Sequence, residues 1–339
     1  MIRDFAARRQ IPWVQALLLL LVLLSPGTAR AADPLPSWND GAAKSAIIDF
    51  VTRVTTAGSA DFVATADRVA VFDNDGTLWP ENPIPFQMAF AVDEARRHAA
   101  EDPAIAADPM VKALLAGDYD TLMAGPHHEG LLQIINVTHS GMTTDEFAKA
   151  VTAWMATAKH PRFGVLYDQL TYQPMQEVLA YLRANGFTTY IVSGGGADFM
   201  RVWSDRVYGI PPGQVVGSTA RVKYELREAG PVLVKTMESL FVDDKSGKPA
   251  GIHQFIGKRP IAVFGNSDGD KEMLEYGTIA NPLPSLGVII RHTDGEREYQ
   301  YDVNPKSSGT LVKALEEAQA RGWHVVSMKD DWKTVFAPK

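Results

Sequence analysis

Short apolar runs that stop abruptly at polar or glycine residues recur along this chain. A run of four or five such residues, without alternation between apolar and polar positions, is typical of a parallel strand buried on both faces. We predict strands of this kind at 68–72, 188–192, 260–264 and 287–290. In an open parallel sheet, ligands bind beyond the carboxyl ends of the strands, so the residues just after each run carry the most information about function.

Helical periodicity fills the long interval between the first two runs. From Trp79 to Asn185, apolar residues recur at helical spacing, with breaks at several prolines. This interval is much longer than a crossover between parallel strands requires. We therefore predict an α/β fold with a doubly wound, Rossmann-like parallel core formed by 32–78 and 186–339, and an inserted helical cap domain at 79–185.

The first 31 residues differ from the rest in composition and in the order of their charged and apolar residues. Arginines precede an apolar run from Trp13 to Leu24, and the small residues Ala29-Arg30-Ala31 follow a Ser-Pro-Gly break. This order is typical of a secretory signal peptide cleaved after Ala31. The apolar run is shorter than a bilayer-spanning helix needs. We expect a periplasmic or secreted protein without stable membrane association, and an uncleaved anchor is the alternative.

Composition excludes several classes of function. The chain has no cysteine, which excludes disulfides, thiol catalysis and cysteine-bound metals. Its formal charge is −7, and removing 1–31, which hold four arginines and one aspartate, makes it more negative. An acidic protein without a basic run is a poor nucleic-acid binder. We therefore expect a small-molecule partner.

Two carboxylates follow the first predicted strand, in Asp73-Asn74-Asp75-Gly76-Thr77. A carboxylate at this edge of the sheet can attack phosphorus and form an acyl-phosphate. A second carboxylate two residues later can protonate the leaving oxygen and then deprotonate the attacking water. An ordinary Asp-Gly turn is the alternative interpretation.

Two further polar turns follow later strands. Ser193 precedes three glycines, whose unshielded amides can cradle an anion. The segment Gly265-Asn266-Ser267-Asp268-Gly269-Asp270 offers hard oxygen ligands suited to Mg²⁺. A solvated acidic turn or a structural calcium loop is the alternative for this segment.

A nucleophilic carboxylate that approaches a phosphate dianion needs a fixed cation nearby. Lys248 precedes a short helical stretch before the third strand, so it can reach the carboxyl edge of the sheet. Lys258 stands at the start of that strand, which points to the opposite edge. We prefer Lys248 over Lys258, with Lys235 a more distant candidate.

Taken in order, these motifs resemble the haloacid dehalogenase-like hydrolase superfamily, in particular its capped phosphatases such as phosphoserine and phosphorylcholine phosphatases. The resemblance implies Asp73 as nucleophile, Asp75 as acid/base, and Ser193 and Lys248 as phosphoryl-binding residues. It implies Mg²⁺ bound by Asp73, the Asp75 carbonyl, and the fourth motif G-D-x-x-x-D. Here Asn266 replaces the first aspartate of that motif, where its amide oxygen can still bind the metal, and Asp270 matches the second. One negative charge is missing, so either Asp268 or Asp270 supplies it or the affinity for the metal is lower.

We therefore expect an exported Mg²⁺-dependent phosphatase that hydrolyses small phosphate monoesters through an aspartyl-phosphate. Asp75 favours phosphoryl transfer over carbon–halogen cleavage, because the dehalogenase branch lacks that residue. Two alternatives stay open: a phosphate-ester-binding protein that has lost turnover, which Asn266 favours, and a pyrophosphatase or other phosphoanhydride hydrolase. His292, after the last predicted strand, either borders the site or is a surface histidine.

Overall fold

The computed structural model describes residues 32–123, 129–303, 305 and 308–337. Leu35–Lys339 form one compact unit. The predicted signal peptide at 1–31 lies outside the described residues. In the part of the chain that the structure describes, no helix has the length and apolar character needed to cross a membrane.

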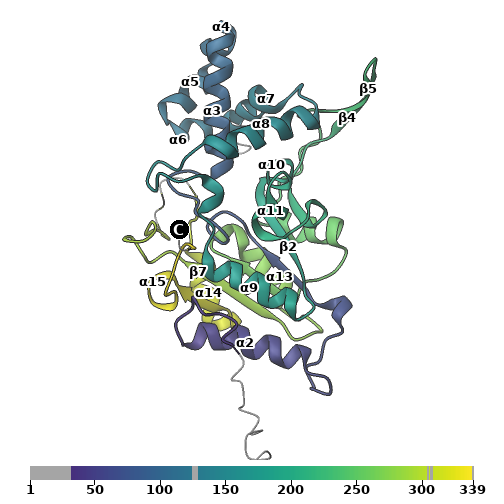
Figure 1. The fold of residues 1–339 in the computed structure, drawn as a ribbon, viewed down its shortest axis with the longest axis vertical. Helices are drawn as coiled ribbons and strands as arrows, with labels where there is room; N and C mark the ends of the chain where they lie inside the picture. The colour runs from purple at the N-terminus through teal and green to yellow at the C-terminus, as the bar shows by residue number, and fades with distance from the viewer. Residues whose placement is uncertain (1–31, 124–128, 304, 306–307, 338–339) are drawn as a thin grey trace, which may run out of the picture. The chain divides into compact units, whose positions relative to one another are not determined.

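A six-stranded parallel sheet forms the centre of the fold (Figure 1). Its strand order is β3-β2-β1-β6-β7-β8. The chain therefore moves outward in one direction from β1 to β3 and returns to the other side of β1 with β6. This reversal places a topological switch point, the usual ligand site of such sheets, at the end of β1. The strands are β1 (Val69–Phe72), β2 (Thr188–Gly196), β3 (Val215–Ser218), β6 (Ala262–Gly265), β7 (Leu286–Arg291) and β8 (His324–Ser327).

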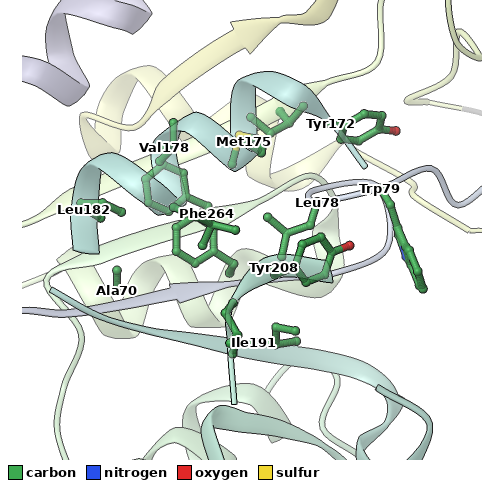
Figure 2. Close-up of a cluster of buried hydrophobic side chains, with 14 of the residues drawn as sticks. Ala70, Leu78, Trp79, Tyr172, Met175, Val178, Leu182, Ile191, Tyr208 and Phe264 are labelled. Carbon is green, nitrogen blue, oxygen red and sulfur yellow. The ribbon is translucent and has the colours of Figure 1, made fainter. Parts of the chain in front are cut away.

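Both faces of the sheet are covered, which explains why its strands read as unbroken apolar runs. Ala70 and Phe72 face one hydrophobic cluster, and Val69 and Val71 face another. Figure 2 shows the first of these clusters, where Phe264 lies beneath helix α9 (Gln173–Ala184). The rings of Phe72 and Phe264 stack with centroids 4.4 Å apart. This packing fixes the register of β1 against β6, and with it the position of the residues that follow each strand.

The helices of the core flank this sheet. Met175, Val178 and Leu182 of α9 belong to the first cluster, and residues of α13 and α14 to the second. The core helices are α2 (Ala42–Thr55), α9 (Gln173–Ala184), α10 (Ala197–Arg201), α11 (Ser204–Tyr208), α12 (Gly247–Gly251), α13 (Lys271–Thr278), α14 (Lys313–Arg321) and α15 (Met328–Asp331). Short 3₁₀ turns lie at Thr65–Asp67, Tyr167–Gln169, Pro212–Gln214 and Asp268–Asp270, and a π-helical turn at Ile252–Ile256.

Among the described residues, six helices between β1 and α9 form the cap (Figure 1). Their own small core gathers around Ala95, Val111 and Leu114. The helix α8 begins with a capping box, in which Thr143 and Glu146 satisfy each other's backbone amides. The cap helices are α3 (Phe86–Glu101), α4 (Pro103–Ala107), α5 (Pro109–Ala116), α6 (Tyr119–Met123), α7 (Glu129–His139) and α8 (Thr144–Thr157).

Two elements pack differently from what the predicted limits of the cap, 79–185, imply. The predicted range 79–185 includes helix α9, but the apolar face of this helix packs on the central sheet, so it belongs to the core. The antiparallel hairpin of β4 (Val222–Arg227) and β5 (Gly230–Lys235) lies in the range assigned to the core. However, Val234 pairs with Thr143 at the start of α8, so this hairpin extends the cap. Periodicity shows that a segment is helical but not what it packs against.

Candidate active site

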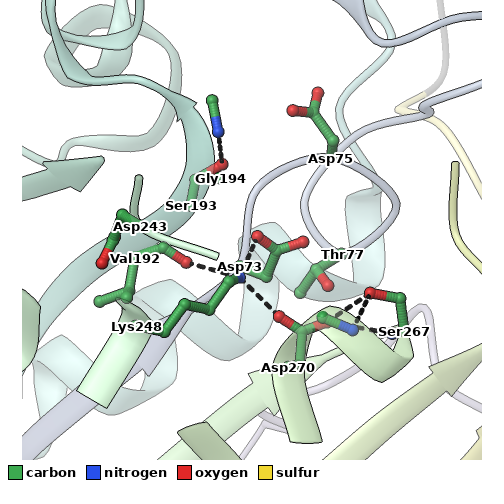
Figure 3. Close-up of polar contacts among 12 residues, drawn as sticks. Asp73, Asp75, Thr77, Val192, Ser193, Gly194, Asp243, Lys248, Ser267 and Asp270 are labelled. Carbon is green, nitrogen blue, oxygen red and sulfur yellow. Dashed lines mark hydrogen bonds and ion pairs between the residues drawn. The ribbon is translucent and has the colours of Figure 1, made fainter. Parts of the chain in front are cut away.

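Asp73 and Lys248 meet at the carboxyl end of β1 (Figure 3). Lys248 Nζ donates to Asp73 Oδ1 at 2.6 Å, to Asp270 Oδ1 at 2.6 Å and to the Val192 carbonyl at 3.0 Å. The lysine is only 2% exposed. A buried ammonium with three oxygen acceptors is fully paired, and it is held in one position beside the Asp73 carboxylate.

The charges of this cluster are strongly coupled. Burial by itself would lower the pKa of Lys248, but the carboxylates of Asp270 and Asp73 outweigh it and raise that pKa above the ordinary lysine value. Burial raises the pKa of Asp73, and the nearby Asp270 adds to the effect, whereas Lys248 opposes it. The lysine therefore remains a cation, and its charge offsets part of the cost of burying an ionised Asp73.

Asp75 lies two residues after Asp73, and the three residues Asp73, Asp75 and Lys248 line one cavity. Its Oδ1 accepts a hydrogen bond of 2.7 Å from the indole Nε1 of Trp79. Burial raises the pKa of Asp75 to about 7, although the Trp79 hydrogen bond works in the opposite direction. A carboxyl group with this pKa exchanges its proton near neutrality, which is the property that a general acid/base needs.

The last residues of β2 lie beside Asp73 and Asp75, so the strand continues through the predicted serine turn. Ser193 Oγ accepts from the Gly195 amide at 3.1 Å, and the Gly196 amide donates to Gln87 Oε1 at 2.6 Å. A Cβ atom on Gly196 would come within 2.7 Å of the Gln87 side chain, so the absence of a side chain there permits the contact. Because Gln87 belongs to α3, the end of β2 links the core directly to the cap.

The polar residues of the loop after β6 make contacts with different partners. Asn266 Oδ1 accepts from the Thr77 hydroxyl at 3.1 Å. Asp270 Oδ2 accepts from the amides of Asn266 and Ser267 at 2.9 and 3.0 Å, while its Oδ1 holds Lys248. Both oxygens of Asp270 are thus engaged by protein donors, so its contacts here position Lys248 and the loop.

Asp268, the candidate to supply the missing charge, has a structural role in this fold. It accepts from the amides of Val312, Lys313 and Ala314 at 3.1, 3.2 and 2.9 Å. These are amides at the start of α14, where a carboxylate commonly caps a helix. Asp268 therefore has its oxygens committed to α14.

The other lysine candidates lie apart from Asp73. Lys258 pairs with Asp67 at 3.0 Å, at the amino-terminal end of the sheet. Lys235 lines the cavity but pairs with Asp198 and lies over the ring of Phe147, 4.5 Å from its centroid. Of the three candidates, Lys248 is the lysine that the fold brings to Asp73.

A cavity of about 710 Å³ opens above these residues. The core contributes the polar floor with Asp73, Asp75, Ser193 and Lys248. The cap and the hairpin contribute largely apolar walls, which include Met88, Leu132, Ile135, Phe147 and Met237. A polar floor under apolar walls suits a ligand whose charged end reaches the floor and whose organic part contacts the cap.

Two residues at the rim of this cluster carry no motif signal in the sequence. Glu81 lines the cavity and is buried, eight residues after Asp73. His292 is also buried, so it is not a surface histidine: its Nε2 lies 2.7 Å from the Gly76 carbonyl and its Nδ1 3.0 Å from Glu298. Position after a strand is the only sequence signal for His292, and a lone glutamate such as Glu81 has none.

The oxygen donors near Asp73 fit a hard divalent cation. Asp73, the Asp75 carbonyl and Asn266 Oδ1 come from the ends of adjacent strands β1 and β6, and all three are oxygen ligands. Within the described residues, no three histidine, aspartate or glutamate side chains converge as a metal cluster. A cation bound here would depend on an amide and a main-chain carbonyl as well as a carboxylate, with less negative charge than three carboxylates provide.

Comparison with known proteins identifies the class to which this fold and site belong. The family model of haloacid dehalogenase-like hydrolases matches residues 70–275. This range covers most of the chain and includes Asp73, Ser193, Lys248 and Asp270. The chain therefore belongs to the haloacid dehalogenase-like hydrolase family.

One solved structure with a TM-score above 0.5 supports the fold, and others are similar over much of the chain. A conserved protein of unknown function from Anaerococcus prevotii superposes with a TM-score of 0.53, with 15% identity over 87% of this chain and 96% of that chain. A protein of unknown function from Bordetella pertussis gives 0.48, with 17% identity over 77% and 98% of the two chains. A phosphoserine phosphohydrolase-like protein from Francisella tularensis gives 0.39, with 16% identity over 75% and 98%. No curated protein matches by sequence.

Proposed function

We propose that this protein is a phosphatase that hydrolyses small phosphate monoesters through an aspartyl-phosphate on Asp73. The observation that carries the proposal is the contact between Asp73 and the buried Lys248, with Asp75 two residues away in the same cavity. A carboxylate nucleophile, a fixed cation and an acid/base with a pKa of about 7 are the groups that this reaction requires.

In the first step, a carboxylate oxygen of Asp73 attacks phosphorus, and the bond between phosphorus and the leaving oxygen breaks. Asp75 gives its proton to that oxygen, so the alcohol leaves neutral. Lys248 and Ser193 hold the phosphoryl oxygens and offset their charge. In the second step, Asp75 takes a proton from water as the water attacks phosphorus. The acyl-phosphate bond then breaks, which releases phosphate and restores Asp73.

We propose Mg²⁺ as the cation that Asp73, the Asp75 carbonyl and Asn266 bind. When bound, it would offset negative charge on the phosphoryl group during transfer. Support comes from the all-oxygen donor set, because hard oxygen ligands suit Mg²⁺.

A substrate panel tests the activity. The mature protein is expected to release phosphate from several monoesters in the presence of Mg²⁺, and EDTA is expected to suppress the release until Mg²⁺ is restored. Pyrophosphate and phosphoanhydrides in the same panel test the alternative hydrolase. Tight binding of a monoester without turnover under any of several divalent metals would instead favour the binding protein that Asn266 suggests.

The pH dependence tests the role of Asp75. With an alkyl phosphate, kcat/KM is expected to fall as the pH rises through about 7, because Asp75 must be protonated to supply the leaving group with a proton. The group is protonated below its pKa and ionised above it, so the loss occurs on the alkaline side. In Asp75→Asn this alkaline limb is expected to disappear from the residual activity. An unchanged limb in that variant would assign it to another group.

Export is also a proposal, supported by the signal-like pattern of residues 1–31. The native protein is expected in the periplasm or the medium, with Ala32 as its first residue in N-terminal sequencing. Recovery of the intact N-terminus in the membrane fraction would show an anchor instead.

A further inference from the structure

A buried carboxylate that the proposed mechanism does not use lies against the loop after β6. Glu81 is 4% exposed. Its Oε1 accepts from Asn266 Nδ2 at 2.6 Å and from the Tyr301 hydroxyl at 2.7 Å, and its Oε2 accepts from the Ser308 hydroxyl at 2.6 Å. Three short hydrogen bonds from three separate segments hold this side chain in one orientation.

The surrounding backbone is shaped to admit this contact. Gly76 has a φ of +79°, and a Cβ there would meet Asn266 Nδ2 at 2.1 Å and Glu81 Oε1 at 2.4 Å. Gly309 has a φ of +85°, and a Cβ there would meet Glu81 Oε1 at 2.3 Å. Two glycines thus leave room for Glu81 and Asn266 directly against the turn that carries Asp75.

The charge of Glu81 lacks a cationic hydrogen-bond partner among the described residues. Each of its three donors is neutral. Burial raises the pKa of Glu81 and the positive charge of His292 lowers it, but the two ring nitrogens of His292 bond to Glu298 and to the Gly76 carbonyl and not to Glu81. A buried carboxylate supplied only by neutral donors is costly, and a cation bound next to it lowers that cost.

Asn266 connects this carboxylate to the proposed cation site. The amide nitrogen donates to Glu81, and the oxygen Oδ1, which accepts from the Thr77 hydroxyl, is the candidate metal ligand. The bond to Glu81 fixes which end of the amide faces the carboxylate, and it draws electron density toward Oδ1. An amide polarised in this way is a better metal ligand than an isolated asparagine.

We propose that Glu81 is a positioning residue that supplies, through Asn266, negative charge to the divalent cation site beside Asp73. This inference rests on the proposed function only for the presence of that site. It assigns the compensating charge to the segment that follows β1, and not to Asp268 or Asp270, whose oxygens bind α14, Lys248 and loop amides.

The affinity for Mg²⁺ tests the proposal without reference to turnover. Isothermal titration of the metal-free protein with Mg²⁺, and with Mn²⁺ as a second probe, is expected to show that Glu81→Gln weakens binding by about tenfold or more, the usual cost of removing an outer-shell partner. Tyr301→Phe removes a neutral donor to the same carboxylate but keeps its charge, so it is expected to change the affinity by no more than about threefold.

A charge exchange separates this role from a merely structural one. Asn266→Asp alone places a second carboxylate against Glu81, so it is not expected to improve binding. In the double variant Glu81→Gln/Asn266→Asp, the negative charge is moved from residue 81 to its hydrogen-bonded neighbour, residue 266. The affinity for Mg²⁺ is then expected to return to within a few fold of that of the original protein.

Several outcomes would overturn the proposal: wild-type protein that binds neither cation, Glu81→Gln that melts normally and binds both cations unchanged, or a double variant no better than Glu81→Gln. Failure of the proposed function would look different. If the binding pattern appears as expected but no monoester is hydrolysed, the role of Glu81 stands and the phosphatase activity does not.

Discussion

Asp73→Asn is expected to lower kcat for p-nitrophenyl phosphate by about 10⁴-fold or more, the scale on which removal of a covalent nucleophile acts. The asparagine oxygen can still accept from Lys248, so the geometry around Asp270 is preserved. The loss is therefore expected in turnover and not in folding. Steady-state kinetics and circular dichroism of the same preparation measure the two separately.

Trapping the intermediate gives the matching positive result. After acid quenching of a reaction with ³²P-labelled substrate, label is expected on the wild-type protein and absent from Asp73→Asn. A variant that keeps full activity, or that still takes up label, would remove Asp73 from the role of nucleophile.

Lys248→Met is expected to affect both stability and activity. It leaves Asp73 and Asp270 buried without their shared cation, and breaking a buried ion pair from one side costs about 3–5 kcal/mol. Loss of a fixed charge that faces the transferred group is expected to lower kcat by about 10²–10³-fold. Urea denaturation measures the first effect, and kinetics under folding conditions measure the second.

The pH dependence of this destabilisation has a definite sign. Without the ammonium, the two carboxylates are tolerated only when protonated, so the difference in unfolding free energy between wild type and variant is expected to shrink as the pH falls. Lys258→Met is the matched control, because that lysine is half exposed and pairs with Asp67 at the other edge of the sheet. It is expected to change stability by about 1 kcal/mol at most and turnover not at all. Equal effects of the two substitutions would contradict the role given to Lys248.

Much of the core could be predicted because its strands are buried on both faces. Such strands appear in the sequence as apolar runs that end near the carboxyl edge of the sheet, so Asp73 and Ser193 could be placed at that edge, although β2 itself continues through Ser193 to Gly196. The strand β3 has only Val215 and Val216 before Gly217-Ser218, β4 is largely exposed, and β5 has only three apolar residues in a row. None of these gives the run of four or five apolar residues that marks the predicted strands. The hairpin escapes prediction for the same reason.

The polar part of the site was predictable only where a strand or a glycine marked it. Lys248 could be proposed because a cation was needed and its place before the third strand allowed it to reach Asp73. Glu81 and Asp268 depend on tertiary contacts instead. Glu81 bonds to residues 185 and 220 positions away, and Asp268 binds amides 44 to 46 positions away. A local sequence pattern cannot show contacts between residues that lie so far apart in the sequence.

The two ends of the compact unit are joined to each other. Trp38 pairs with Trp332, the Asn39 amide donates to the Asp331 carbonyl, and the Lys333 amide donates to the Ser37 carbonyl. Tyr172, at the start of α9, pairs in turn with Phe336. Trp332 and Phe336 therefore complete the packing around both the first residues of the unit and the helix that covers the sheet. Closure of this unit must therefore wait until Phe336 has been synthesised, so a chain that stops before Trp332 is expected to leave Trp38 and the start of α9 without their partners.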